Sequence, residues 1–218
     1  MSPIRPSARL GAAVAALAVP FVLVACGADN TPTSPQTGTQ PGAATSAPAG
    51  AGVSREHNDA DVRFAQTMIP HHQQAVEMAG MATERATSAE VKDLATQIRS
   101  AQDPEIATMT GFLQAWGAEV PATGAMSGMD HGSMPGMDQS GMPGMMTKEQ
   151  MQQLGGATGA GFDTMFLQMM IAHHQGAVTD AQRELTEGTN PEAKALASQI
   201  IEGQTAEITR MQQLLKTG

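Results

Sequence analysis

Apolar side chains recur at steps of three and four residues along the second quarter of the chain, which is the spacing of a buried helix face. Two neighbouring stripes are formed by Phe64, Met68, His71, Ala75 and Met78, and by Ala65, Ile69, His72, Val76 and Ala79. Ser88 is a favourable N-cap for a partner helix, whose apolar positions continue to Trp116. No sustained alternation of apolar and polar residues predicts a strand, so the pattern favours an all-α protein.

The same pattern occurs twice, because residues 61–113 match residues 163–215 without a gap at a constant offset of 102. About 23 of the 53 aligned positions are identical. Each copy has the pattern of a helical hairpin, and two hairpins that each expose an apolar stripe bury it by packing together. The repeat therefore predicts a four-helix bundle with hairpins at residues 57–117 and 161–218.

The N-terminal residues 1–25 predict a signal peptide. Arg5 and Arg9 precede an uncharged apolar run that is too short for a comfortable membrane span. The run ends in Leu-Val-Ala-Cys, which resembles a bacterial lipobox, so we expect Cys26 to be lipidated and to become the first mature residue. The alternative is an ordinary signal peptide with an incidental cysteine.

The segment that follows Cys26 has almost no large apolar side chains. Residues 26–56 are rich in Gly, Ala, Thr, Ser and Pro, and such a segment cannot bury enough surface to offset its ordering entropy. We interpret it as a disordered tether between the lipid and the bundle. These two features predict an extracytoplasmic lipoprotein of the cell membrane.

Charge and composition exclude several classes of function. The chain of 218 residues has a formal net charge of -9 and no basic run, so nothing would neutralise the phosphates of a nucleic acid. A single Cys excludes an internal disulfide framework and a cysteine-based zinc site. The 17 Met residues are the unusual feature, because a thioether is a soft metal ligand as well as a core group.

Paired histidines carry the strongest candidate chemistry. Met-Ile-Pro-His-His in the first repeat and Met-Ile-Ala-His-His in the second place a thioether one turn before each imidazole pair, on stripes that are otherwise apolar. A buried imidazole needs a hydrogen-bond partner or a metal ion. The plainer reading is a set of core histidines with hydrogen-bond partners. The candidate metal ligands are Met68, His71, His72, Met170, His173 and His174.

Ligand softness favours Cu(I). Carboxylate di-iron bundles place a Glu where this chain has Met68 and Met170, and thioether with imidazole suits Cu(I) better than iron or magnesium. Glu105 and Glu207 lie on the second helix of each repeat. They are either solvated or hydrogen-bonded to an imidazole, and they also keep a harder di-metal site open as the rival.

The connection between the hairpins, residues 118–160, is a second candidate metal-binding segment. Met-x-Gly-Met motifs recur in it about every eight residues, and Gly and Pro keep it from forming a helix. A flexible chain of this kind can wrap several thioethers around one soft ion, although a low-complexity linker of drifted composition would look similar. The auxiliary ligands expected here are Met126, Met129, His131, Met134, Met137, Met142, Met145 and Met146.

The pattern from Asp61 through Phe64, Met68 and His71-His72, and its copy after Asp163, resembles the signature of the DUF305 family. The resemblance covers about residues 57–216. It implies a ferritin-like four-helix bundle in a secreted or membrane-anchored bacterial protein. It also implies copper binding by the Met and His residues of the two repeated motifs, since a cyanobacterial relative is a periplasmic copper-binding protein.

We therefore expect a membrane-anchored protein that captures Cu(I) and serves copper tolerance or delivery, with copper-handling proteins as partners. No turnover is implied. Two alternatives remain. One is a ferritin-like di-metal oxidoreductase, and the other is a cell-envelope interaction module that binds no metal.

Overall fold

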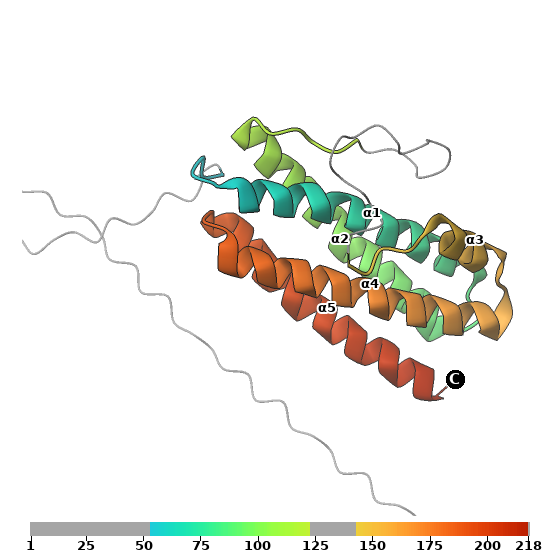
Figure 1. Ribbon diagram of the computed structural model, residues 1–218. Coiled ribbons are helices and arrows are strands. Elements are labelled where there is room, and N and C mark those ends of the chain that lie inside the picture. Colours follow the sequence, from blue (N-terminus) through green and yellow to red (C-terminus); the bar gives the residue numbers. More distant parts are fainter. Residues whose placement is uncertain (1–52, 123–142, 218) are drawn as a thin grey trace, which may run out of the picture. The chain divides into compact units, whose positions relative to one another are not determined.

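The computed structural model describes residues 53–122 and 143–217, and all of its regular structure is helical (Figure 1). The helices are α1 (Asp59–Arg85), α2 (Ala89–Trp116), α3 (Lys148–Gly156), α4 (Gly159–Glu187) and α5 (Pro191–Thr217). No strand occurs in these two ranges, which confirms the all-α prediction. None of the described helices is long and apolar enough to cross a membrane. The predicted signal peptide and Cys26 lie outside the described residues.

Helix α3 was not predicted, because it lies within the segment expected to be irregular. Its nine residues begin with a capping box, in which Thr147 accepts a hydrogen bond from the Gln150 amide and the Gln150 side chain accepts one from the Thr147 amide. Leu154 is its one fully buried side chain and packs into the main core. The cap and this single anchor hold a helix that is too short to be stable alone.

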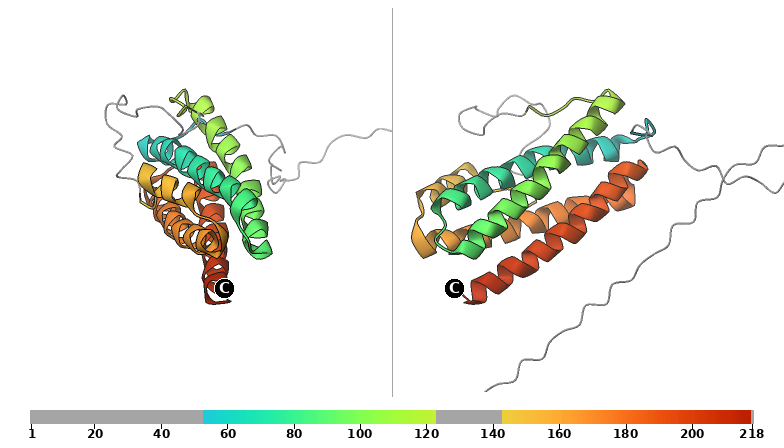
Figure 2. Two further views of the ribbon diagram at one scale, coloured as in Figure 1. Left: turned by 90° about the vertical axis from the view of Figure 1, so that its right-hand side faces the viewer. Right: turned by 180° about the vertical axis from the view of Figure 1, so that it is seen from behind.

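The two hairpins, α1–α2 and α4–α5, meet mainly along α1 and α4. Helices α2 and α5 contact each other much less, and Figure 2 (right) shows both of them in front of α1 and α4. Asn58 at the start of α1 donates to the carbonyl of Glu187 at the end of α4, so these two central helices are antiparallel. The centre of the fold is therefore the α1–α4 contact.

An aspartate at the start of each hairpin holds the turn of the other hairpin. Asp61 accepts hydrogen bonds from the backbone of Thr189 at 3.0 Å and of Asn190 at 2.9 Å. Asp163, its repeat equivalent, accepts from the backbone of Thr87 at 3.0 Å. The same contact thus joins the two hairpins at both ends of the bundle. This is expected when two copies of one unit pack about a two-fold axis.

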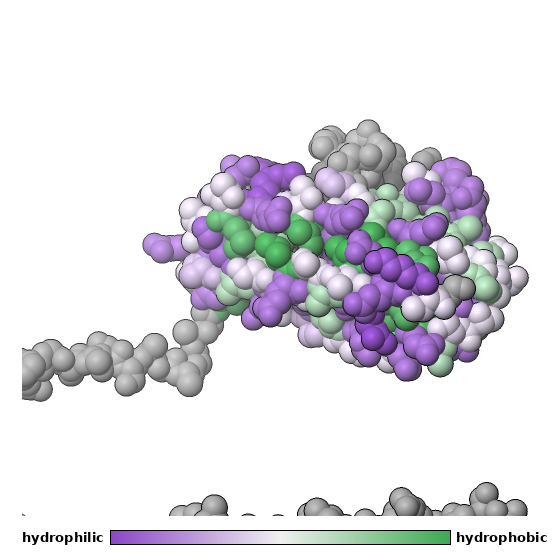
Figure 3. Space-filling model, turned by 90° about the horizontal axis from the view of Figure 1, so that it is seen from below, coloured by the Kyte–Doolittle hydropathy of each residue, from purple (hydrophilic) through white to green (hydrophobic). Residues whose placement is uncertain are grey.

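The apolar core is divided into two clusters. One contains Ala75, Met78 and Met170 with the C-terminal half of α1, and the other contains Phe64, Met68 and Met109 with its N-terminal half. Partly buried apolar side chains pack against both clusters. The face in Figure 3 shows a broken band of apolar residues among polar ones. The boundary between the clusters falls at the histidine pairs.

Candidate metal site

All four paired histidines are buried where the two halves of the core meet. His71 and His72 of α1 and His173 and His174 of α4 are each no more than 1% exposed. The ring centroids of His71 and His173 lie 3.7 Å apart, and each lies 6.4 Å from its sequence neighbour's ring. The structure thus brings the four predicted imidazoles into one layer, which we call the histidine layer.

The outer imidazoles are held by carboxylates from the outer helices. Nε2 of His72 lies 2.7 Å from Glu105 Oε2 on α2, and Nε2 of His174 lies 2.6 Å from Glu207 Oε2 on α5. Because a carboxylate oxygen accepts, Nε2 carries the proton and the Nδ1 of a neutral ring keeps its lone pair. A carboxylate behind an imidazole in this way orients metal-binding histidines in many proteins.

The inner imidazoles form no hydrogen bond of ordinary geometry, although the Pro143 carbonyl lies near the His71 ring. Both ring nitrogens of His71 and of His173 are buried and unpaired, and so are the Nδ1 atoms of His72 and His174. Burial lowers the pKa of His71 to about 3, with His72 and His174 adding to the fall and the Pro143 carbonyl opposing it. Burial and the neighbouring imidazoles also lower the pKa of His173. The two inner imidazoles are therefore neutral, and each keeps a nitrogen lone pair that is available to bind a metal.

The two motif methionines lie one helical turn before the histidine pairs and belong to different parts of the core. Met68 is fully buried in the cluster with Phe64, whereas Met170 is fully buried in the cluster with Met78. The two methionines thus belong to the two apolar clusters on either side of the histidine pairs in the sequence of each helix. Their role as ligands stays a prediction.

The rings do not form a metal cage as they stand. Among residues 53–122 and 143–217, no group of three or more His, Cys, Asp or Glu side chains is arranged to hold a metal ion. The reason is visible in the inner pair, whose rings lie against each other with a tilt of 40°. Imidazole nitrogens and thioethers are donors that suit a soft ion. Binding of such an ion would require the inner rings to turn or the thioethers to act as ligands.

Most of the expected auxiliary ligands lie outside the described residues, namely Met126, Met129, His131, Met134, Met137 and Met142. The structure describes the last two, and Met146 is buried while Met145 is partly buried. The Gln74 side chain pairs with the Met146 backbone. The C-terminal end of the connection is therefore attached to the bundle beside α1.

Sequence reasoning missed two buried amides near the layer. Gln102 and Gln204 are 1% and 4% exposed, and neither carboxamide atom of either residue has a hydrogen-bond partner. Each lies one turn before the glutamate that contacts an imidazole. The signal that could have identified them is a polar residue kept identical in both repeats on an otherwise apolar stripe.

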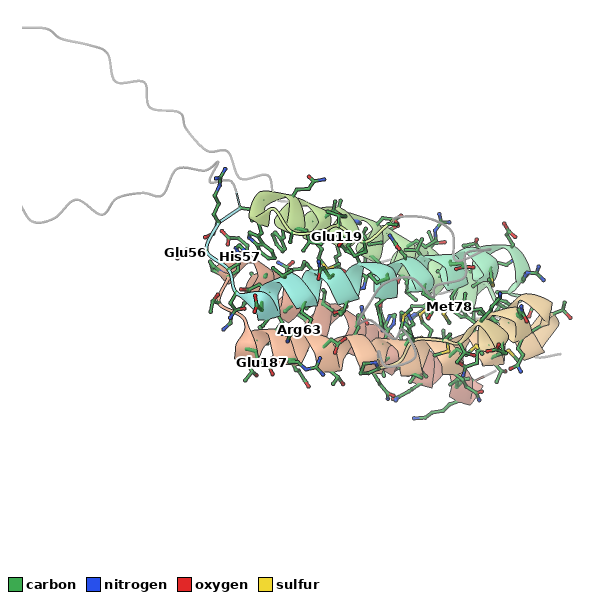
Figure 4. All side chains as sticks on the ribbon, turned by 45° about the horizontal axis from the view of Figure 1, so that its top comes forward. Glu56, His57, Arg63, Met78, Glu119 and Glu187 are labelled. Atoms are coloured by element: carbon green, nitrogen blue, oxygen red, sulfur yellow. The ribbon has the colours of Figure 1, made fainter. Side chains whose placement is uncertain are left out.

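Two other polar contacts near the N-terminal end of α1 are exposed. His57, which precedes α1, is exposed and stacks on Trp116 with centroids 4.9 Å apart. Arg63 of α1 and Glu187 of α4 form an exposed ion pair at 3.6 Å (Figure 4). His57 therefore serves as a matched exposed control for the buried histidines.

The chain belongs to the DUF305 family, because the family model "Domain of unknown function (DUF305)" matches residues 61–215. This confirms the resemblance seen in the repeated motif. No protein of curated function matches the chain significantly.

Solved structures of the same family resemble the fold. A DUF305 protein from Streptomyces coelicolor, regarded as secreted, is 35% identical over 72% of this chain and 91% of its own, with a TM-score of 0.63. A DUF305 fragment from Deinococcus radiodurans is 28% identical over 74% of this chain and 98% of its own, with a TM-score of 0.63. The protein CopM in its Cu(II)-bound form is 37% identical over 72% of this chain and 96% of its own, with a TM-score of 0.58. CopM structures also exist in Cu(I)-bound, Ag-bound and apo forms.

Proposed function

We propose that this protein binds Cu(I) in the histidine layer and serves copper capture, tolerance or delivery outside the cytoplasm. The observation that carries the proposal is the set of unpaired nitrogens on the four buried imidazoles. A buried polar atom without a partner costs free energy, so a fold that keeps four such rings in one layer needs a compensating ligand. The copper-bound and silver-bound forms of CopM, a relative with the same fold, support the choice of a soft ion.

The test is Cu(I) affinity, measured anaerobically by competition with a chromophoric chelator. The variant His71→Leu/His173→Leu keeps side-chain volume and removes the inner nitrogens, so we expect a large loss of affinity. His57→Leu removes an exposed imidazole of the same chain and should leave the affinity unchanged. Unaltered Cu(I) binding by the double variant would remove the histidine layer from the proposal.

Stability on adding copper separates this proposal from a module that binds no metal. An ion that binds only the folded state stabilises it by about 2.7 kcal/mol when present at about 100 times its Kd. We therefore expect a clear rise in Tm with Cu(I) or Ag(I) for the natural sequence and little rise for the double variant. A Tm that neither ion changes would favour the interaction module.

The alternative di-metal oxidoreductase needs carboxylates as ligands. Glu105 and Glu207 are the candidates, yet each is about 20% exposed and already bonded to one imidazole. Metal analysis of protein from cells supplied with copper, iron and manganese decides between the two. Copper in the isolated protein supports our proposal, and iron or manganese with oxygen-dependent activity supports the oxidoreductase.

We also propose that a lipid on Cys26 anchors the protein to the outer face of the cell membrane, as the lipobox pattern indicates. The secreted character of the Streptomyces coelicolor relative supports an extracytoplasmic location. The variant Cys26→Ala should move the protein from the membrane fraction to the soluble one. Persistence in the membrane fraction would contradict a lipid anchor.

A further inference from the structure

A short segment before α3 lies directly against α4 at the histidine layer. This segment, Pro143–Met146, is called the strap here, and Figure 1 shows it in yellow running toward α3. A Cβ atom built on Gly144 would lie 2.6 Å from the Ala172 carbonyl oxygen and 2.8 Å from that of His173. A Cβ on Gly176 would collide with the Pro143 carbonyl oxygen. Backbone therefore meets backbone here, and only glycine fits at both places.

The other helix of the pair fastens the strap. Gln74 of α1, which is fully buried, donates from Nε2 to the Met146 carbonyl oxygen at 2.9 Å and accepts from the Met146 amide at 2.7 Å. The Met146 side chain is 8% exposed and joins the cluster that contains Met170. Gln74 thus satisfies both backbone groups of a residue that is buried against the bundle.

The repeat explains why the strap is found on one half of the bundle. Gln74 and Gly176 occupy equivalent positions, at the offset of 102 that relates the two repeats. A strap on α1 in the same arrangement would need space that the Gln74 side chain fills, and a strap on α4 needs a glycine at 176. At this position the first repeat has Gln74, which holds the strap by hydrogen bonds and is called the clamp here. The second repeat has Gly176, which leaves room for the strap and is called the seat.

The strap also lies close to the inner imidazoles. Gly144 contacts the backbone of His173, and the Pro143 carbonyl oxygen is close enough to the His71 ring to oppose the fall of its pKa. Any ion in the histidine layer must therefore pass or displace the strap to leave on this side.

We propose that Gln74 is a positioning residue for metal exchange, which holds the strap over the histidine layer and slows release of the bound ion. This proposal rests on the proposed function and adds an exchange route to it. Met145, a partly buried strap residue next to Met146, carries a soft donor. The second repeat, and not the first, is the side on which release is controlled.

The test loads the full mature protein with Cu(I) and follows its release to an excess of a chromophoric chelator in a stopped-flow instrument. Gln74→Leu removes the clamp, and Gly176→Ala removes the seat from a different helix. We expect release on the order of ten-fold faster in each variant, because two buried hydrogen bonds or their equivalent are lost. Gly80→Ala is the control, since a Cβ there meets nothing within 4 Å.

The double variant Gln74→Leu/Gly176→Ala makes the test sharper. Both changes free the same segment, so the double variant should release copper no faster than the faster single one. Release at the natural rate in folded Gln74→Leu protein, judged by circular dichroism, would overturn the proposal. If Gly176→Ala does not fold, Gln74→Leu decides alone, and if Gln74→Leu does not fold, Gly144→Ala takes its place.

The two proposals fail in different ways. Loss of Cu(I) binding in His71→Leu/His173→Leu together with natural release rates in the strap variants would overturn the strap alone. Cu(I) binding that survives in His71→Leu/His173→Leu would overturn the histidine layer as the metal site.

Discussion

The imidazoles of His71 and His173 pack against each other at the centre of the bundle, with ring centroids 3.7 Å apart and a tilt of 40° between the rings. Neither ring forms a hydrogen bond of ordinary geometry. They come from equivalent positions of two repeated helices, so the local two-fold axis of the duplication passes close to them. Burial of two polar rings at this point has a cost in stability, and among the described residues the Pro143 carbonyl offsets part of it at His71 alone.

Replacing this inner pair should stabilise the metal-free protein. His71→Leu/His173→Leu removes unpaired buried nitrogens, and relief of each such group is worth about 1–3 kcal/mol. We expect a higher midpoint in urea for the metal-free variant, together with weaker Cu(I) binding. His72→Leu is the contrasting control, because it leaves Glu105 without its imidazole and should lower the midpoint. A lower midpoint for the inner pair would contradict the structural assignment of unpaired rings.

The repeat made most of the fold predictable. Stripes of apolar residues at helical spacing marked the helices, and the histidines fell on those stripes, so their burial could be expected from the sequence. A hydrogen bond from an imidazole to Glu105 was one of the options that the spacing left open, and the structure contains it. Each of these features depends on local periodicity or on identity between the two copies.

The missed features depend on difference between the copies. Gln74 and Gly176 are equivalent positions with unlike residues, and only the folded strap shows why one must be glutamine and the other glycine. Helix α3 was missed because a segment of nine residues is too short to show a clear helical period, although the Thr147 cap was present in the sequence. Long-range backbone contacts of this kind leave no periodic signal.

Asp163 should be a major contributor to the contact between hairpins. It accepts hydrogen bonds from the Thr87 amide at 3.0 Å, the Thr87 hydroxyl at 2.6 Å and the Ser88 amide at 2.9 Å. Asp163→Ala leaves these turn donors unpaired, so we expect a loss of about 3 kcal/mol in the free energy of unfolding. Urea denaturation measures it, with exposed Asp93→Ala as the control. Equal midpoints for the two variants would show that the contact contributes little.

The buried amides should behave like the inner imidazoles. Gln102→Leu/Gln204→Leu replaces carboxamides that have no partner with apolar groups of similar volume. We expect the metal-free protein to gain about 1–2 kcal/mol. The comparison variant is Gln74→Leu, whose carboxamide is fully paired and whose loss should destabilise the same state. A loss of stability in both variants would indicate that Gln102 and Gln204 have partners in solution.

The Asp61 end of the bundle differs from the Asp163 end by one carboxyl group. Glu184 is 2% exposed and lies beneath Gly188, whereas the equivalent position in the first repeat is Ala82. Burial raises the pKa of Glu184 to about 8, and the neighbouring Asp61 contributes in the same direction. Burial also raises the pKa of Asp61, but hydrogen bonds from Asn58, Glu184, Asn190 and Thr189 outweigh it and hold that pKa below its ordinary value. The pair therefore shares one proton, and Glu184 carries it.

This proton makes stability depend on pH. Between the ordinary pKa of 4.5 and the folded value of about 8, the folded protein keeps a proton that the unfolded chain loses. Stability therefore falls as pH rises through this window, because the folded state binds more protons. Glu184→Gln keeps a neutral hydrogen-bond donor to Asp61 at every pH, so its stability should not show this fall.

The measurement is the difference in unfolding free energy between the natural protein and Glu184→Gln from pH 5 to pH 8. Taking the difference cancels the contribution of His71 and His173, whose lowered pKa values make stability rise with pH over the acid side of the range. We expect the unfolding free energy of Glu184→Gln to rise steadily relative to that of the natural protein as pH increases. For Glu84→Gln, at an exposed position of α1, the difference in unfolding free energy from the natural protein should not change with pH. A constant difference between Glu184→Gln and the natural protein would mean that Glu184 is ionised in the fold and that Asp61 does not share its proton.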